Sequence, residues 1–469
     1  MFIARASLAL LPLLVCLHPV SSLAADWSDA DLAAAAALRD RALSGTSAFD
    51  HVSALTTEVG PRFAGSAGDA AAVRWALNRM GQLGFTNVRS QDVLVPRWIR
   101  GEAEAILLGS PPRDLVTVTL GGSIGTVAEG LEAVVVQVES LEDLQKLDAD
   151  TIANKIVFIN KRIERTRDGH GYSDAVRGRV FGPSAAAKLG AIAIVIRSIG
   201  TSDDRIAHTG TLRYEIDAPR IPAFALSNPD ADLLERRVKL GKPVRLRLRS
   251  TARELPPAWS ANVIGEIPGR EKAEEIVLLG AHLDSWDISQ GAVDDGAGVA
   301  IVLEAARLIR RLERKPARTI RVVLFANEEF GLSGAREYAE QIGEAAANHV
   351  LAMEADIGPG PVWRIRSQVA PEAAPEIASM HEVLKPLEVE LGGNDAQGGA
   401  DVGPLRDLGV PILDLSLDAT HYFDVHHTIN DTLLKIDPKT LDQSVAAYAA
   451  AAYLAATKQG DFGRLAKGE

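Results

Sequence analysis

The fold is decided by a stretch in the second half of the chain, residues 276–311, which reads IVLLGAHLDSWDISQGAVDDGAGVAIVLEAARLIRR. The continuous apolar run Ile276–Ala281 predicts a strand buried on both faces, and Gly298–Arg311 predicts the helix after it. We expect similar strands at Ile320–Ala326, Val350–Met353 and Val410–Leu417, and helices near Gly334–Ile342, 372–384 and 439–456. Strands that alternate with helices are typical of a mostly parallel sheet flanked by helices, so the predicted fold class is α/β.

The region before this stretch has a different pattern. Helices are expected between residues 28 and 83, and a strand follows from Thr86 to Val95. Residues 99–256 then carry short β-rich runs separated by Gly, Pro and Asp, with one Ala-rich helix at Ser184–Leu189. We therefore predict one domain formed by residues 25–98 and 257–469. A β-rich domain, residues 99–256, is inserted into it, with Glu254–Pro257 as the return linker.

Composition excludes several classes of protein. The chain has 469 residues, and 50 Lys plus Arg against 62 Asp plus Glu give a net charge of −12. An acidic chain without a basic tract lacks the clustered cations that nucleic-acid binding needs, so no nucleic-acid partner is expected. Cys16 is the one cysteine. An internal disulfide and a cysteine-based metal site are thus excluded, and any metal must be held by His, Asp and Glu.

The first 24 residues have the layout of a secretory signal peptide. A short start with Arg5 precedes the apolar run Leu8–Val20, and small residues follow at Ser22–Ala24. The apolar run is shorter than the roughly 20 residues that span a bilayer. We expect cleavage after this segment, a secreted or periplasmic protein, and no membrane segment in the mature chain.

Metal-binding side chains follow three of the expected strands. His282 and Asp284 come at the end of the first strand, Glu328 and Glu329 after the second, and Asp356 after the third. Ligands of such sheets bind beyond the carboxyl ends of the strands, so these side chains should lie close together. Any one of these pairs alone could be an ordinary surface pair or a helix cap, but their order along successive strands favours a metal site.

Two further positions complete the predicted site. Asp294 opens the helix that follows the first strand, and His427 lies in a late loop. The expected ligands are His282, Asp294, Glu329, Asp356 and His427. Two zinc ions that share a carboxylate suit this set of nitrogen and oxygen donors, although manganese or cobalt would also be accepted. Asp284 could accept the second ring N–H of His282, and Glu328 remains as the general base.

The chain resembles a known family at these same motifs. His282–Trp286, Gly291–Gly296, Asn327–Gly331, Met353–Asp356 and His426–Thr432 are similar to motifs of the di-zinc exopeptidases that include bacterial leucyl aminopeptidase and glutamate carboxypeptidase II. Gly60–Arg62, His208–Gly210 and Gly398–Asp401 resemble the carboxypeptidase Q-like subgroup. The resemblance implies one zinc held by His282, Asp294 and Asp356, and a second held by Asp294, Glu329 and His427. It also implies a homodimer and a protease-associated-like inserted domain that partly covers the site.

The predicted function is hydrolysis of dipeptides or short peptides with a free N-terminus, by a water held between the two metals with Glu328 as general base. Asp401, Tyr422 and His208 are candidate substrate contacts. The motifs do not distinguish an aminopeptidase from a dipeptidase or a carboxypeptidase. A glutaminyl-peptide cyclase, which uses one zinc on the same architecture, and a binding module without activity are the alternatives.

Overall fold

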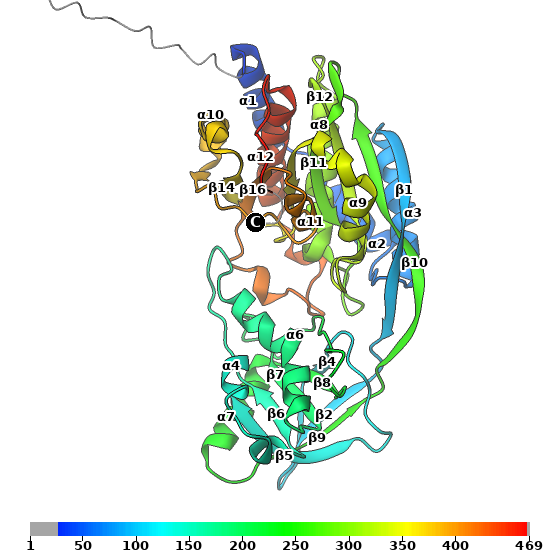
Figure 1. Cartoon of the computed structure of the whole chain (residues 1–469), viewed down its shortest axis with the longest axis vertical. Coiled ribbons are helices and arrows are strands. Elements are labelled where there is room, and N and C mark those ends of the chain that lie inside the picture. The colour runs from blue at the N-terminus through cyan, green and yellow to red at the C-terminus, as the bar shows by residue number, and fades with distance from the viewer. Residues whose placement is uncertain (1–26, 467–469) are drawn as a thin grey trace, which may run out of the picture.

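The structure, a computed structural model, describes residues 27–466. The predicted signal peptide lies outside these residues. Within the described part, the strands form two sheets of eight strands each. Figure 1 shows them as two halves of an elongated molecule, joined along one side by the long strands β1, Thr86–Ile99, and β10, Arg253–Ile267. None of the described helices is both long and apolar enough to cross a membrane.

The first sheet has the order β1-β10-β12-β11-β13-β16-β14-β15. Its four central strands run parallel and are close to the expected ranges: β11 Lys272–His282, β12 Arg318–Phe325, β13 His349–Glu354 and β16 Ile412–Leu417. The outer strands β1, β10 and β14, Val362–Gln368, pair antiparallel, and the two-residue strand β15, Glu390–Leu391, ends the sheet. The predicted α/β fold with a mostly parallel mixed sheet is therefore confirmed.

Helices cover both faces of the first sheet. One face carries three N-terminal helices, two long buried helices and the shorter α10: α1 Asp29–Leu43, α2 Ala48–Glu58, α3 Ala67–Gln82, α8 Ala297–Arg310, α12 Pro438–Thr457 and α10 Ala374–Leu384. The other face carries α9 Ser333–Ile342 and α11 Gly403–Asp407. Burying a strand on both faces requires apolar side chains at nearly every position, and β11 is buried from Ile276 to His282.

The second sheet is built entirely from the segment between β1 and β10, residues 100–252, which we call the second-sheet region. Its order is β3-β2-β9-β5-β6-β7-β8-β4. The strands are β2 Ala103–Leu107, β3 Arg113–Leu115, β4 Thr117–Thr119, β5 Leu131–Val138, β6 Ile156–Ile159, β7 Ala193–Arg197, β8 Ala223–Leu226 and β9 Arg245–Ser250. The helices are α4 Leu141–Leu144, α5 Ala149–Ile152, α6 Tyr172–Lys188 and α7 Asn228–Lys239. The exact limits of an inserted domain remain a prediction.

Two local expectations differ from the structure. The expected return linker Glu254–Pro257 is a strand: it lies inside β10, one of the two strands that join the halves, where the pairing with β1 shifts register between Val95 and Arg97. The prolines are tolerated because they sit at this irregularity, where no ladder hydrogen bond is required of them. The helix expected at Ser184–Leu189 begins twelve residues earlier, at Tyr172.

The glycines that obscured the start of α6 have a packing role. Gly178 and Gly182 face the sheet, and a Cβ on Gly182 would come within 3.0 Å of Ile159 and 3.1 Å of Ile194. These glycines therefore let the helix lie directly on β6 and β7, at a cost in helix propensity that tertiary packing offsets.

Candidate metal centre

The carboxyl ends of three parallel strands meet at one edge of the first sheet. His282 ends β11 and lies opposite Phe325, the last residue of β12. Glu328 and Glu329 follow β12 directly, and Asp356 follows β13. The predicted convergence of these side chains is what the structure shows, and it follows from the parallel register of the three strands.

Asp294 is held in place by a residue from the far end of the chain. It lies in the turn Ala292–Gly296 that leads into α8. The carboxylate of Asp431 accepts the N–H of Val293 at 2.6 Å and that of Asp294 at 3.2 Å. Burial raises the pKa of Asp431 to about 7, although these backbone N–H groups oppose the rise. The turn is thereby fixed with the Asp294 side chain facing the strand ends.

A second aspartate supports the same turn. The Asp295 carboxylate accepts the N–H of His282 at 3.2 Å and the N–H of Gly298 at 2.9 Å, which joins the end of β11 to the start of α8. Gly298 cannot carry a side chain, because a Cβ there would lie 1.9 Å from the carbonyl oxygen of Ala355. The helix start therefore packs directly against the segment that carries Asp356.

Asp294 lies between two histidines. Its Oδ1 is 3.1 Å from Nε2 of His282, and its Oδ2 is 3.4 Å from Nε2 of His427. His282 Nε2 is also 3.3 Å from Asp356, and His427 Nε2 is 2.8 Å from Glu329. The five residues predicted as ligands thus form one cluster, with Asp356, at 18% exposure, the least buried side chain.

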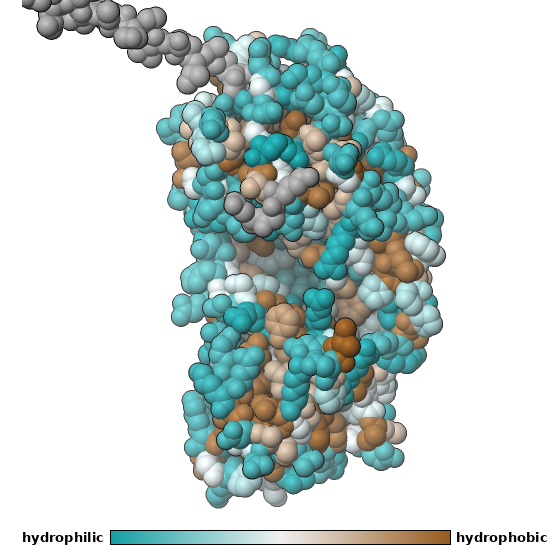
Figure 2. Space-filling model, in the orientation of Figure 1, coloured by the Kyte–Doolittle hydropathy of each residue, from teal (hydrophilic) through white to brown (hydrophobic). Residues whose placement is uncertain are grey.

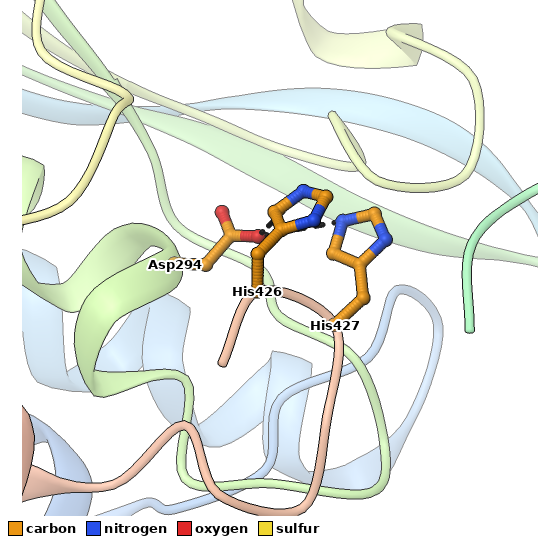
Figure 3. A group of neighbouring side chains, drawn as sticks. All are labelled: Asp294, His426 and His427. Carbon is orange, nitrogen blue, oxygen red and sulfur yellow. Dashed lines mark ion pairs between the residues drawn. The ribbon is translucent and has the colours of Figure 1, made fainter. Parts of the chain in front are cut away.

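Two neighbours of these residues were not predicted as part of the cluster. Candidate ligand atoms within 4.8 Å of one another include those of His426 with Asp294 and His427, and those of Asp295 with His282 and Asp356. Figure 3 shows His426 and His427 both facing Asp294. The two rings stack at 3.5 Å. Among the described residues His426 pairs with one carboxylate, Asp294 at 3.6 Å, whereas His427 pairs with two, Asp294 and Glu329. The sequence did offer a signal for both residues, because each directly neighbours an expected ligand, in the pairs His426–His427 and Asp294–Asp295.

The tautomer of His282 is set by a backbone group. Its Nδ1–H donates to the main-chain oxygen of Asp284 at 3.1 Å, whereas the Asp284 carboxylate is 3.6 Å away. That carboxylate instead accepts the N–H of Glu328 at 2.9 Å. The main chain of Asp284 is thus the nearer acceptor for His282, while its carboxylate lies beside the ring and accepts from Glu328. The predicted role of the Asp284 side chain towards His282 stays a prediction.

The charges of the cluster fit a divalent cation. Burial lowers the pKa of His427, but Glu329 and Asp294 outweigh it and raise the pKa to about 9. Burial raises the pKa of Glu329 to about 7, against the opposing charge of His427. Oxygens of Asp294 and Glu329 lack hydrogen-bond partners among the described residues. Buried carboxylates in excess over histidines need positive charge, and nitrogen and oxygen donors suit zinc and related divalent ions.

The cluster opens into a cavity of about 810 Å³. The hollow between the two halves of the molecule is visible in Figure 2. Its walls come from both sheets and include Glu328, Glu329, Asp356, Tyr422 and the second-sheet residue Arg179. Burial, followed by the charge of Asp356, raises the pKa of Glu328. The Glu328 carboxylate makes no hydrogen bond or ion pair with any described residue, so it is free to act on a bound molecule.

The three predicted substrate contacts have different environments. Tyr422 lines the cavity. Asp401 is fully buried beside Glu354, which accepts its main-chain N–H at 3.2 Å, and neither side-chain oxygen of Asp401 has a hydrogen-bond partner in residues 27–466. His208 does not line the cavity; it lies beneath the backbone of His426. Tyr422 is thus the only one of the three on the cavity wall.

Arg179 is a cavity residue that sequence reasoning missed. It projects from α6, is 5% exposed, and donates to the carbonyl oxygen of Thr211 at 3.2 Å. Within residues 27–466 it forms no ion pair with a carboxylate. A buried cation without a counter-charge, on the wall of a cavity, is an unusual arrangement. No signal in the sequence marked it, because the start of its helix was not recognised.

A histidine and carboxylate cluster at the ends of parallel strands suits a metal-dependent hydrolase, because ligands of such sheets bind there and a bound metal ion can activate water. The model of peptidase family M28 matches residues 262–452. Carboxypeptidase Q of Bos taurus is 34% identical over 87% of this chain and 85% of its own. The chain therefore belongs to peptidase family M28 and is a metallopeptidase.

Solved structures agree with this assignment. The crystal structure of a peptidase M28 precursor from Shewanella amazonensis is 48% identical, covers 93% of this chain and 99% of its own, and superposes with a TM-score of 0.91. A zinc aminopeptidase from Bacillus subtilis is 22% identical, covers 89% of this chain and 97% of its own, and has a TM-score of 0.63. The second comparison concerns the fold alone.

Proposed function

We propose that this metallopeptidase is a di-metal exopeptidase that hydrolyses dipeptides or short peptides with a free N-terminus. The observation that carries the proposal is the position of Asp294, whose two oxygens face Nε2 of two different histidines. A carboxylate in that position can serve two ions at once. Zinc is the metal proposed, two ions per chain, because the donors are histidine and carboxylate and a relative with this fold is a zinc aminopeptidase.

Each residue of the cluster has a proposed role. His282, Asp294 and Asp356 would hold one ion, and Asp294, Glu329 and His427 the other. Bound divalent metal supplies Lewis-acid polarisation of the peptide carbonyl and makes water a better nucleophile at neutral pH. Glu328 takes the proton of the attacking water and returns it to the leaving amine. Asp284 keeps Glu328 in place through the hydrogen bond to its N–H.

The cavity supports short substrates. It is bounded on one side by the strand ends and on the other by the second-sheet region, which limits the length of peptide that fits. The guanidinium of Arg179 supplies a counter-charge for a substrate carboxylate, such as the free C-terminus of a dipeptide. Tyr422 lines the same cavity and is proposed as a substrate contact, with Asp401, buried beside Glu354, as a positioning group. The inserted-domain limits, homodimer and export remain part of this proposal.

The proposal is tested by Glu328→Gln. The substitution preserves size and removes the proton acceptor, so kcat for a free dipeptide should fall by about 10²- to 10⁴-fold while the metal content per chain is retained. The matched control is Glu340→Gln on the exposed side of α9, which should retain wild-type turnover. Near-normal turnover by Glu328→Gln would exclude Glu328 as the base.

A further inference from the structure

The second-sheet region reaches into the metal centre through the backbone of residues 208–210. The N–H of Thr209 donates to the main-chain oxygen of His427 at 2.9 Å, and Nδ1–H of His427 faces the oxygen of Thr209 at 3.4 Å. Beside this pair, Nδ1–H of His208 donates to the main-chain oxygen of His426 at 2.7 Å. Three contacts from a segment more than 200 residues away thus surround the His426–His427 backbone.

His427 needs such support because its backbone is strained. Its φ is +60°, in the left-handed region that residues with a Cβ seldom adopt. A conformation of this kind persists where surrounding contacts hold it. The hydrogen bond from Nδ1 to Thr209 also selects the tautomer whose Nε2 carries a lone pair, and Nε2 is the atom that faces Asp294 and Glu329.

Residues 208–210 are themselves held by buried contacts within the second-sheet region. His208 is 2% exposed, and its N–H donates to Oγ of Ser198 at 2.8 Å. Its ring lies against Gly200, where a Cβ would come within 2.1 Å of the ring. Arg100 donates to the hydroxyl of Thr209 at 2.7 Å. The segment can therefore impose its geometry on the loop that it contacts.

We propose that His208 and the Thr209 backbone are positioning groups for His427, so that metal affinity at the site of His427 depends on the second-sheet region. The inference rests on the proposed function, since it requires His427 to bind a metal. The ring of His282 is oriented by the main chain of Asp284, and among the described residues His282 has no hydrogen bond or ion pair with the second-sheet region. The two metal affinities should therefore respond differently when His208 is replaced.

The test is zinc titration of metal-free enzyme by calorimetry, with no turnover involved. His208→Phe keeps a ring of similar size and removes the donor to His426. The zinc affinity of His208→Phe should fall by about 10- to 100-fold at one site and stay unchanged at the other. That range is typical when a residue that supports a metal ligand is substituted. His427→Ala identifies which binding step belongs to His427. The weakened step in His208→Phe should be the same one.

His349→Phe is the matched control. His349 is equally buried and has Nε2 2.9 Å from the Tyr338 hydroxyl, away from the cluster. The His349→Phe variant should be less stable than wild type but should bind zinc at both sites with wild-type affinity. If His208→Phe does not fold, Gly200→Ala displaces the same ring and should produce the same selective loss.

Wild-type affinity at both sites in a folded His208 or Gly200 variant would overturn the inference, as would equal weakening of both. If wild-type enzyme binds a single zinc, the di-metal proposal fails, and the inference is judged on that one site: an unchanged affinity in the variants overturns it.

Discussion

Asp431→Asn tests how strongly the metal turn depends on one carboxylate. Asp431 is 2% exposed, and each of its oxygens accepts one backbone N–H, at 2.6 Å from Val293 and 3.2 Å from Asp294. Asparagine has the same shape but only one acceptor oxygen, so one N–H is left facing an NH2 group. A buried donor left unsatisfied costs about 1–3 kcal/mol, and the free energy of unfolding of the metal-free enzyme should fall by that amount.

The same substitution should weaken zinc binding. Asp294 loses part of the support for its backbone, so zinc affinity should fall by about 10- to 100-fold. Urea denaturation followed by circular dichroism measures the first effect, and calorimetric titration measures the second. Asp230→Asn is the control, because Asp230 is buried in the second-sheet region and accepts the N–H of Val116 at 2.8 Å, remote from the cluster. Unchanged stability and zinc affinity in Asp431→Asn would refute the reasoning.

Three other substitutions have defined outcomes. Asp294→Asn should weaken both zinc sites together in a calorimetric titration, and loss of one site alone would indicate a different bridging residue. Burial raises the pKa of Glu304, but hydrogen bonds from Arg307 and His51 outweigh it and lower the pKa from 4.5 to about 2. Ionised Glu304 therefore contributes about 3 kcal/mol above pH 4.5, which is lost as the pH falls towards 2; Glu304→Gln should lack this acid-dependent loss, and acid denaturation parallel to wild type would contradict it. Arg179→Met should raise KM for free dipeptides by about 10- to 100-fold and leave C-amidated dipeptides unaffected, whereas an equal change for both would exclude a carboxylate-binding role.

The central strands and their metal-binding ends could be predicted because the signal is local. An apolar run followed within a few residues by His282, Glu329 or Asp356 marks both a buried strand and the polar group beyond it. The parallel arrangement then brings the three ends together without further information. These three expected ligands therefore meet at one edge of the sheet, whereas Asp294 and His427 join them from the turn held by Asp431 and from the late loop. Metal binding itself remains a proposal.

What the sequence did not reveal depends on contacts between distant segments. The sequence marked His208–Gly210 as a motif, but not its contact with the backbone of His426, and it gave no sign of Arg179. Both depend on the packing of the second-sheet region, which no local pattern encodes. The prolines in Glu254–Pro257 suggested an irregular linker. They are compatible with a strand because they lie at a register shift, where their missing N–H groups are not needed for pairing, and only the pairing with β1 shows this shift. The hydrogen bond from the N–H of Glu328 to the Asp284 carboxylate was not foreseen either, because it joins the ends of two strands that are separated in the sequence.

The most direct test of the central claim is the metal content per chain of active wild-type enzyme, measured while zinc is added back to the metal-free protein and hydrolysis of a free dipeptide is followed. We expect two zinc ions per chain at full activity and no cleavage of the N-blocked dipeptide. One zinc per chain with ring closure of an N-terminal glutaminyl peptide, and no dipeptide hydrolysis, would contradict the account.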